Sequence, residues 1–103
     1  MELDRFTFVL LRRGPRADDY SEEELAELQG GHLAFLDSMR EQGHLVLAGP
    51  FDGQEDETKR GFSLFRTDVA ETKRLIAEGD PSVRAGRMSA EVMTWLTKRG
   101  ALE

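Results

Sequence analysis

The chain has 103 residues, of which 39% are hydrophobic and 33% charged, and its formal net charge is −6 at pH 7. This size and composition are typical of one globular domain over residues 1–103, and the acidic balance argues against nucleic acid or anionic membranes as partners. No apolar run reaches the roughly 18–20 residues of a membrane helix, and no leader-like segment opens the chain, so we expect a cytoplasmic protein. Because cysteine is absent, we expect no disulfides and no thiolate sites.

The first half of the chain predicts a strand, a long helix and a second strand. Residues 5–11 (RFTFVLL) are β-branched and aromatic enough for the first strand. Residues 20–43 are the clearest helix, because Ser21 and Glu24 have the spacing of a capping box at its start. Residues 44–50 (HLVLAGP) predict the second strand, and the final glycine and proline of this segment end the strand.

The second half predicts a loop, a strand, a shorter helix and a last strand. Residues 52–58 (DGQEDET) are acidic and without periodicity, so we expect a solvated loop. A third strand at 61–66, a helix over 68–78 with Asp68 as its N-cap and a fourth strand at 87–96 follow. The order βαββαβ predicts a ferredoxin-like α+β sandwich, in which right-handed crossovers place both helices on one face of the sheet.

The predicted sheet has two apolar faces, although both helices cover the same one. In the first strand, one face carries Phe6, Phe8 and Leu10, and the other carries Thr7, Val9 and Leu11. In the second strand we expect Leu45 and Leu47 to point together. Because monomers avoid large exposed apolar patches, we expect a homodimer that packs sheet to sheet as a dimeric α/β barrel. The alternative is that the charged loop 51–60 folds over the open face.

His32 is predicted to lie on the apolar face of the long helix. That face is marked by Leu25, Leu28, Phe35, Leu36 and Met39. A buried imidazole without a hydrogen-bond partner costs about 1–3 kcal/mol, so a polar group is expected to meet it. Gly30 and Gly31 remove two side chains beside the ring, which leaves room for a ligand. The alternative is a core histidine that a backbone carbonyl or a hydroxyl satisfies.

Asp80 lies in the linker 79–86 (GDPSVRAG), between a glycine and Pro81. Pro81 favours an extended conformation of the residue before it, which limits the positions that the carboxylate can take. In a βαββαβ sheet the second helix ends at the rim where the first begins, so Asp80 is expected within reach of His32. The alternative is a turn residue whose side chain caps its own backbone.

Four segments together resemble the YciI-like (YCII-related) family: 32–36 (HLAFL), 43–51 (GHLVLAGPF), 61–65 (GFSLF) and 79–86 (GDPSVRAG). The stretch 49–59 (GPFDGQEDETK) also resembles the DGPF-type branch of that superfamily. The resemblance implies a ferredoxin-like fold, a dimeric barrel and a site whose histidine and aspartate match His32 and Asp80. Many relatives have an aromatic residue after the Asp-Pro pair, where this chain has Ser82 and Val83.

The resemblance also implies proton-transfer chemistry, because relatives include a dehydrochlorinase of a chlorinated hydroxyhydroquinone and, more distantly, muconolactone isomerases. The hypothesis is a small-molecule lyase, isomerase or dehalogenase in which His32 is the general acid or base and Asp80 orients it. The substrate would lie between the first helix and the sheet, beside Gly49 and Pro50. An anionic group of the substrate would be held by one of two arginines, Arg84 or Arg12.

Two other hypotheses remain: a non-catalytic dimeric protein that binds a small ligand, and a cofactor-free monooxygenase that shares only the architecture. No Walker A or GxGxxG pattern occurs, so we expect no nucleotide cofactor. His32 and His44, the two histidines, are 12 residues apart toward different ends of the helix region, and we expect no metal site. The expected partners are therefore a second copy of the chain and a small-molecule ligand.

Overall fold

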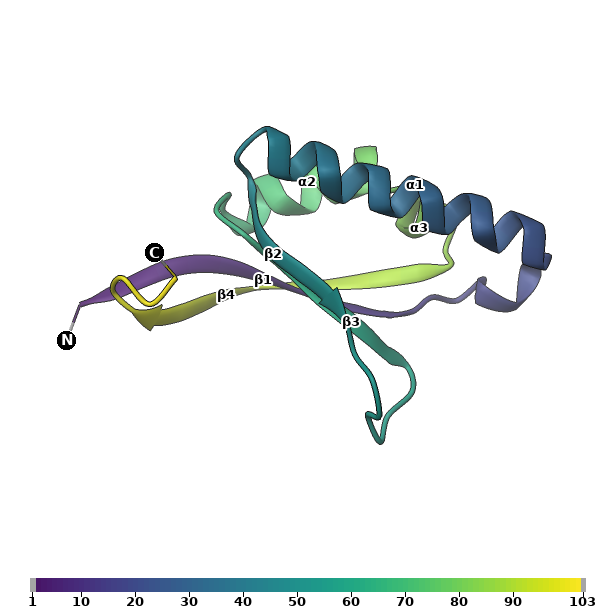
Figure 1. Ribbon diagram of the computed structural model, residues 1–103, viewed down its shortest axis with the longest axis horizontal. Coiled ribbons are helices and arrows are strands. Elements are labelled where there is room, and N and C mark those ends of the chain that lie inside the picture. The colour runs from purple at the N-terminus through teal and green to yellow at the C-terminus, as the bar shows by residue number, and fades with distance from the viewer. Residues whose placement is uncertain (1, 103) are drawn as a thin grey trace.

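The computed structural model describes residues 2–102, which form a four-stranded antiparallel sheet with its helices on one side (Figure 1). The elements in chain order are β1 (Leu3–Arg13), the 3₁₀ turn η1 (Ala17–Asp19), α1 (Glu22–Glu41), β2 (Leu45–Pro50), β3 (Lys59–Phe65), α2 (Val69–Gly79), α3 (Pro81–Arg84) and β4 (Met88–Lys98). The strand order is β2-β3-β1-β4. The predicted βαββαβ order and ferredoxin-like α+β arrangement are therefore confirmed.

Helix α1 begins and ends as its sequence predicts. The Ser21 side chain accepts a hydrogen bond from the Glu24 backbone N–H, and the Glu24 carboxylate accepts one from the Ser21 N–H. The bond from the Ser21 N–H holds the pKa of Glu24 below its ordinary value. Gly43 follows the last turn with a φ of 80°, a conformation that favours glycine. Within residues 2–102, no helix is long and apolar enough to cross a membrane.

The hydrophobic core lies between the helices and one face of the sheet. Val9 and Phe65, on the two central strands, have no exposed surface. They pack with buried side chains of β1, β2, β4 and both long helices: Leu11, Phe35, Met39, Leu45, Ile76 and Met88. Burial of each such side chain contributes about 1.5–3 kcal/mol, so this cluster fixes the position of α1 over the sheet.

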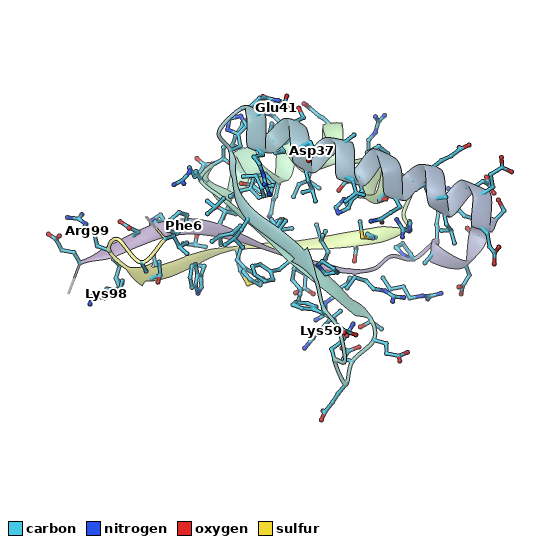
Figure 2. All side chains as sticks on the ribbon, viewed as in Figure 1. Phe6, Asp37, Glu41, Lys59, Lys98 and Arg99 are labelled. Atoms are coloured by element: carbon cyan, nitrogen blue, oxygen red, sulfur yellow. The ribbon has the colours of Figure 1, made fainter. Side chains whose placement is uncertain are left out.

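Neither long helix covers the opposite face of the sheet (Figure 1). On this open face Phe8 stacks on Phe62, with ring centroids 5.2 Å apart. Three large apolar side chains remain exposed there, at 36–41% of their surface: Leu47, Met93 and Trp95. The β2–β3 hairpin, marked by Lys59, projects away from the helices (Figure 2), and its loop leaves this apolar face accessible in the single chain.

The prediction that Leu45 and Leu47 point to the same face is wrong. Leu45 pairs with Phe65 and belongs to the core, whereas Leu47 pairs with Leu64 and is exposed. The register shifts between Leu45 and Leu47, and such a β-bulge inserts an extra residue that breaks strict alternation.

The linker after α2 contains a turn of helix that the sequence interpretation missed. Asp80 has φ −96° and ψ 106°, the extended conformation expected before Pro81. It ends α2 and is also the N-cap of α3, because its side chain accepts a hydrogen bond from the Ser82 N–H. Proline is favoured in the first turn of a helix, where its missing N–H is not needed. One residue therefore connects the end of α2 directly to the start of α3.

Candidate functional site

His32 and Asp80 meet between α1 and the linker after α2. His32 Nδ1 and Asp80 Oδ2 are 2.8 Å apart, and the two side chains are only 9% and 2% exposed. The residues come from positions 48 apart in the chain, and each is fixed by a different helix. Burial of the pair keeps competing water away from this hydrogen bond.

Gly31 allows this contact, because α3 lies directly against α1 at that position. A Cβ atom on Gly31 would lie 2.8 Å from Pro81 Cγ, closer than carbon atoms normally approach. A Cβ on Gly30, in contrast, would meet no atom within 4 Å. The expectation that both glycines leave room for a ligand is therefore wrong at Gly31, where Pro81 fills the space and brings Asp80 up to the imidazole.

The two carboxylate oxygens of Asp80 have different partners. Oδ1 accepts a hydrogen bond from the Ser82 backbone N–H at 3.0 Å, and Oδ2 faces His32. The capping role and the contact with His32, which were weighed as alternatives, therefore occur together. Because an ionised carboxylate is only an acceptor, the imidazole proton belongs on Nδ1, and Nε2 carries the lone pair.

The second ring nitrogen of His32, Nε2, has no protein partner in the part of the chain that the structure describes. Among residues 2–102, no hydrogen-bond partner of Nε2 is found, and no buried side-chain nitrogen or oxygen lacks a partner. Nε2 is therefore not fully buried, and His32 contributes to the wall of a cleft. The arrangement leaves an oriented imidazole with its basic nitrogen open to a ligand.

The cleft lies between α1 and the adjoining ends of β2 and β3, and its volume is about 720 Å³. This volume is within the range of small-molecule sites, roughly 300–1,000 Å³. Its apolar wall includes Leu11, Leu25, Leu33, Leu36 and Met88. Gly49 and Pro50, which were predicted to lie beside the substrate, also line it.

The two arginines singled out from the sequence do not line this cleft. Arg12 Nε lies 2.9 Å from Glu91, and its Nη1 lies 3.6 Å from Asp56. Arg84 is exposed, with Nη1 3.5 Å from the Glu78 carbonyl oxygen. Each arginine is therefore held by partners outside the cleft lining.

Three other arginines line the cleft instead: Arg13, Arg60 and Arg87. Arg13 is paired with Asp18, and Arg60 is exposed. Arg87 is half-buried and donates from Nη1 to Gln29 Oε1 at 2.8 Å and to Ser82 Oγ at 3.3 Å. Sequence reasoning missed Arg87 and Gln29. The available signal was the position of Gln29 three residues before His32, which places both on one face of α1.

No group of three or more metal-ligating side chains comes together among residues 2–102. The chemistry that the cleft residues themselves offer is proton transfer and hydrogen bonding.

Comparison with known proteins places most of the chain in one family. The family model described as the YCII-related domain matches residues 7–96. The Bacillus subtilis (strain 168) protein YjpA is 26% identical over 94 residues, which cover 91% of this chain and 99% of YjpA.

Among the solved structures that share the fold are a dehydrochlorinase and a chlorite dismutase. One is TftG of Burkholderia phenoliruptrix AC1100, a 5-chloro-2-hydroxyhydroquinone dehydrochlorinase that was solved with 2,5-dihydroxybenzoquinone. Its TM-score is 0.57 at 18% identity, and the match covers 94% of this chain and 96% of TftG. A mutant chlorite dismutase from Candidatus Nitrospira defluvii has a TM-score of 0.63 at 12% identity, over 96% of this chain but only 41% of its own. The resemblance found in the sequence is thus confirmed, and the chain belongs to the YCII-related domain family.

Proposed function

We propose that this protein is a small-molecule lyase, isomerase or dehalogenase in which His32 transfers a proton and Asp80 orients the ring. The observation that supports the proposal most strongly is the 2.8 Å contact between His32 Nδ1 and Asp80 Oδ2 at the wall of the cleft. A histidine that only packs in the core would need one partner and would not present its second nitrogen to a cavity of ligand size.

In this mechanism Nε2 of His32 takes a proton from the bound substrate. The positive charge that then forms on the ring lies beside the Asp80 carboxylate, which stays in place through its bond from the Ser82 N–H. The imidazolium afterwards returns the proton to product or to water. General acid–base help of this kind contributes about 10²–10⁴-fold in rate.

The class of reaction is supported by the apolar cleft and by the similarity to TftG. A dehydrochlorination removes one proton and one chloride ion from the substrate, so it needs a base but no oxidant or reductant. A small ring compound with an acidic C–H or O–H bond suits an apolar cleft that has one basic nitrogen. The proposed substrates are therefore halogenated hydroxyhydroquinones and related cyclic compounds.

The proposal is tested by chloride release from 5-chloro-2-hydroxyhydroquinone under anaerobic conditions, measured by ion chromatography. We expect His32→Ala and Asp80→Asn each to lower the rate by at least about 10²-fold, whereas His44→Ala, which changes the histidine outside the cleft, leaves it unchanged. Wild-type rates in both site variants would contradict the proposal. Saturable binding without any chloride release would favour the non-catalytic ligand-binding protein.

We also propose that the working form is a homodimer that packs open face to open face. The support is the open face of the sheet, on which Leu47 of β2 and Met93 and Trp95 of β4 are each more than a third exposed. A second copy would bury these side chains and close the sheets into a barrel, which a charged loop of one chain does not do.

A further inference from the structure

Among the arginines of residues 2–102, Arg87 is the one that is half-buried and has no carboxylate partner. Arg12, which is also half-buried, is paired with Glu91, and the exposed Arg13 with Asp18. The remaining unpaired arginines of this region are exposed: Arg5, Arg40, Arg60, Arg66 and Arg84. Partial burial of a cation without an opposite charge has an unfavourable free energy, so the position of Arg87 favours the binding of an anion.

The protein holds this cation by neutral groups only. Gln29 Oε1 and Ser82 Oγ both accept from Nη1, at 2.8 and 3.3 Å. Within residues 2–102 no acceptor is found for Nε or Nη2. The guanidinium is therefore fixed in orientation while the donors along another of its edges remain available, and such an edge matches the two oxygens of a carboxylate.

We infer that Arg87 binds an anionic oxygen of the ligand in this cleft, and that the ligand is a small molecule with an aromatic or apolar body and one carboxylate or phenolate group. The apolar wall formed by Leu25, Leu33 and Leu36 suits the body, and Arg87 suits the charged end. The inference rests on the cleft of the proposed function but not on its proton transfer.

The anion site and the proton-transfer site share the same supports. Gln29 and His32 lie three residues apart on α1. Ser82 accepts from Arg87 through its hydroxyl and donates its backbone N–H to Asp80. An anion bound at Arg87 would therefore have a fixed position relative to His32, which is what a specificity-determining residue must provide.

The test compares two probes of nearly equal shape, benzoate and the neutral benzamide, by isothermal titration with the full chain. We expect wild type to bind benzoate at least about tenfold more tightly than benzamide, because a charge-assisted pair of hydrogen bonds is lost with the amide. Arg87→Gln should remove this preference, and Arg87→Lys, which keeps the charge but not the planar fork, should be intermediate. Arg84→Gln, which removes an exposed charge outside the cleft, should behave like wild type.

Equal affinity of wild type for the two probes, no benzoate binding at all, or an undiminished preference in Arg87→Gln would overturn the inference. The lysine variant keeps the test valid if the glutamine variant does not fold. The result is independent of catalysis: His32→Ala should keep the benzoate preference even though we expect it to lower turnover. Failure of the anion site and failure of the proposed reaction are thus distinguishable.

Discussion

Ser82 connects the two halves of the candidate site through three hydrogen bonds. Its backbone N–H donates to Asp80 Oδ1, and its hydroxyl donates to the Leu28 carbonyl oxygen at 2.9 Å and accepts from Arg87. The residue is fully buried, so water cannot replace these partners. A serine at this position therefore both joins the linker to α1 and aims the arginine.

Removal of that hydroxyl should loosen the linker without changing the catalytic groups themselves. We predict that Ser82→Ala lowers the free energy of unfolding by about 1 kcal/mol, since the Leu28 carbonyl loses its donor in a buried place. Ser38→Ala, which removes a partly exposed hydroxyl from the last turn of α1, is the control and should not destabilise the protein. Urea denaturation measures both. Equal stability of the Ser82 variant and wild type would show that the hydroxyl is not a structural link.

The two neighbouring glycines of α1 have opposite roles at the level of packed elements. Gly31 allows the close approach of α3, whereas Gly30 faces open space. Gly30 has no packing role, so it only lowers the helix propensity of α1.

We predict that Gly31→Ala destabilises the protein by about 1–3 kcal/mol, because its methyl group overpacks the contact with Pro81. The same change should also lower turnover, since it pushes Asp80 away from His32. Gly30→Ala is the matched control and should stabilise the protein by up to about 1 kcal/mol. Thermal unfolding measures the stability of both variants. If both substitutions changed the stability in the same direction, the proposed contact between Gly31 and Pro81 would be contradicted.

The order of elements could be predicted from the sequence because each helix carries its own start signal. Ser21 and Glu24 marked the start of α1, and Asp68 marked the start of α2. The Asp68 side chain accepts a hydrogen bond from the Glu71 N–H, as expected of an N-cap. Helix α3 was missed, since its four residues are too few to show a helical period. The bulge in β2 was missed because register depends on pairing with β3 rather than on the strand alone.

The positions of His32 and Asp80 could be predicted for a similar local reason. The helix period turned His32 toward the sheet, and Pro81 fixed the backbone of Asp80. Arg87 could not be found in this way, because its role depends on Gln29 and Ser82, which come from two other elements. Side chains that act through long-range neighbours leave little trace in local sequence patterns.

At the scale of the whole molecule, the open face of the sheet predicts self-association. We predict that wild type sediments as a dimer and that Met93→Asp sediments as a monomer, because the change places an unpaired charge in the centre of the packed faces. Thr94→Asp is the control: Thr94 is also exposed but lies on the helix side of the same strand, opposite Thr7. Analytical ultracentrifugation of the three proteins would refute the dimer if wild type were monomeric or if both variants behaved alike.

The claim on which the proposed chemistry depends is that Asp80 keeps the imidazole proton on Nδ1 and leaves Nε2 basic. Asp80→Asn tests it, because the amide oxygen can still cap Ser82 while the amide NH₂ turns to His32. Nitrogen-15 NMR of the imidazole ring at alkaline pH distinguishes the two tautomers. We predict the Nδ1–H tautomer in wild type and the Nε2–H tautomer in Asp80→Asn. The Nε2–H tautomer in wild type, or no difference between the two proteins, would contradict this claim.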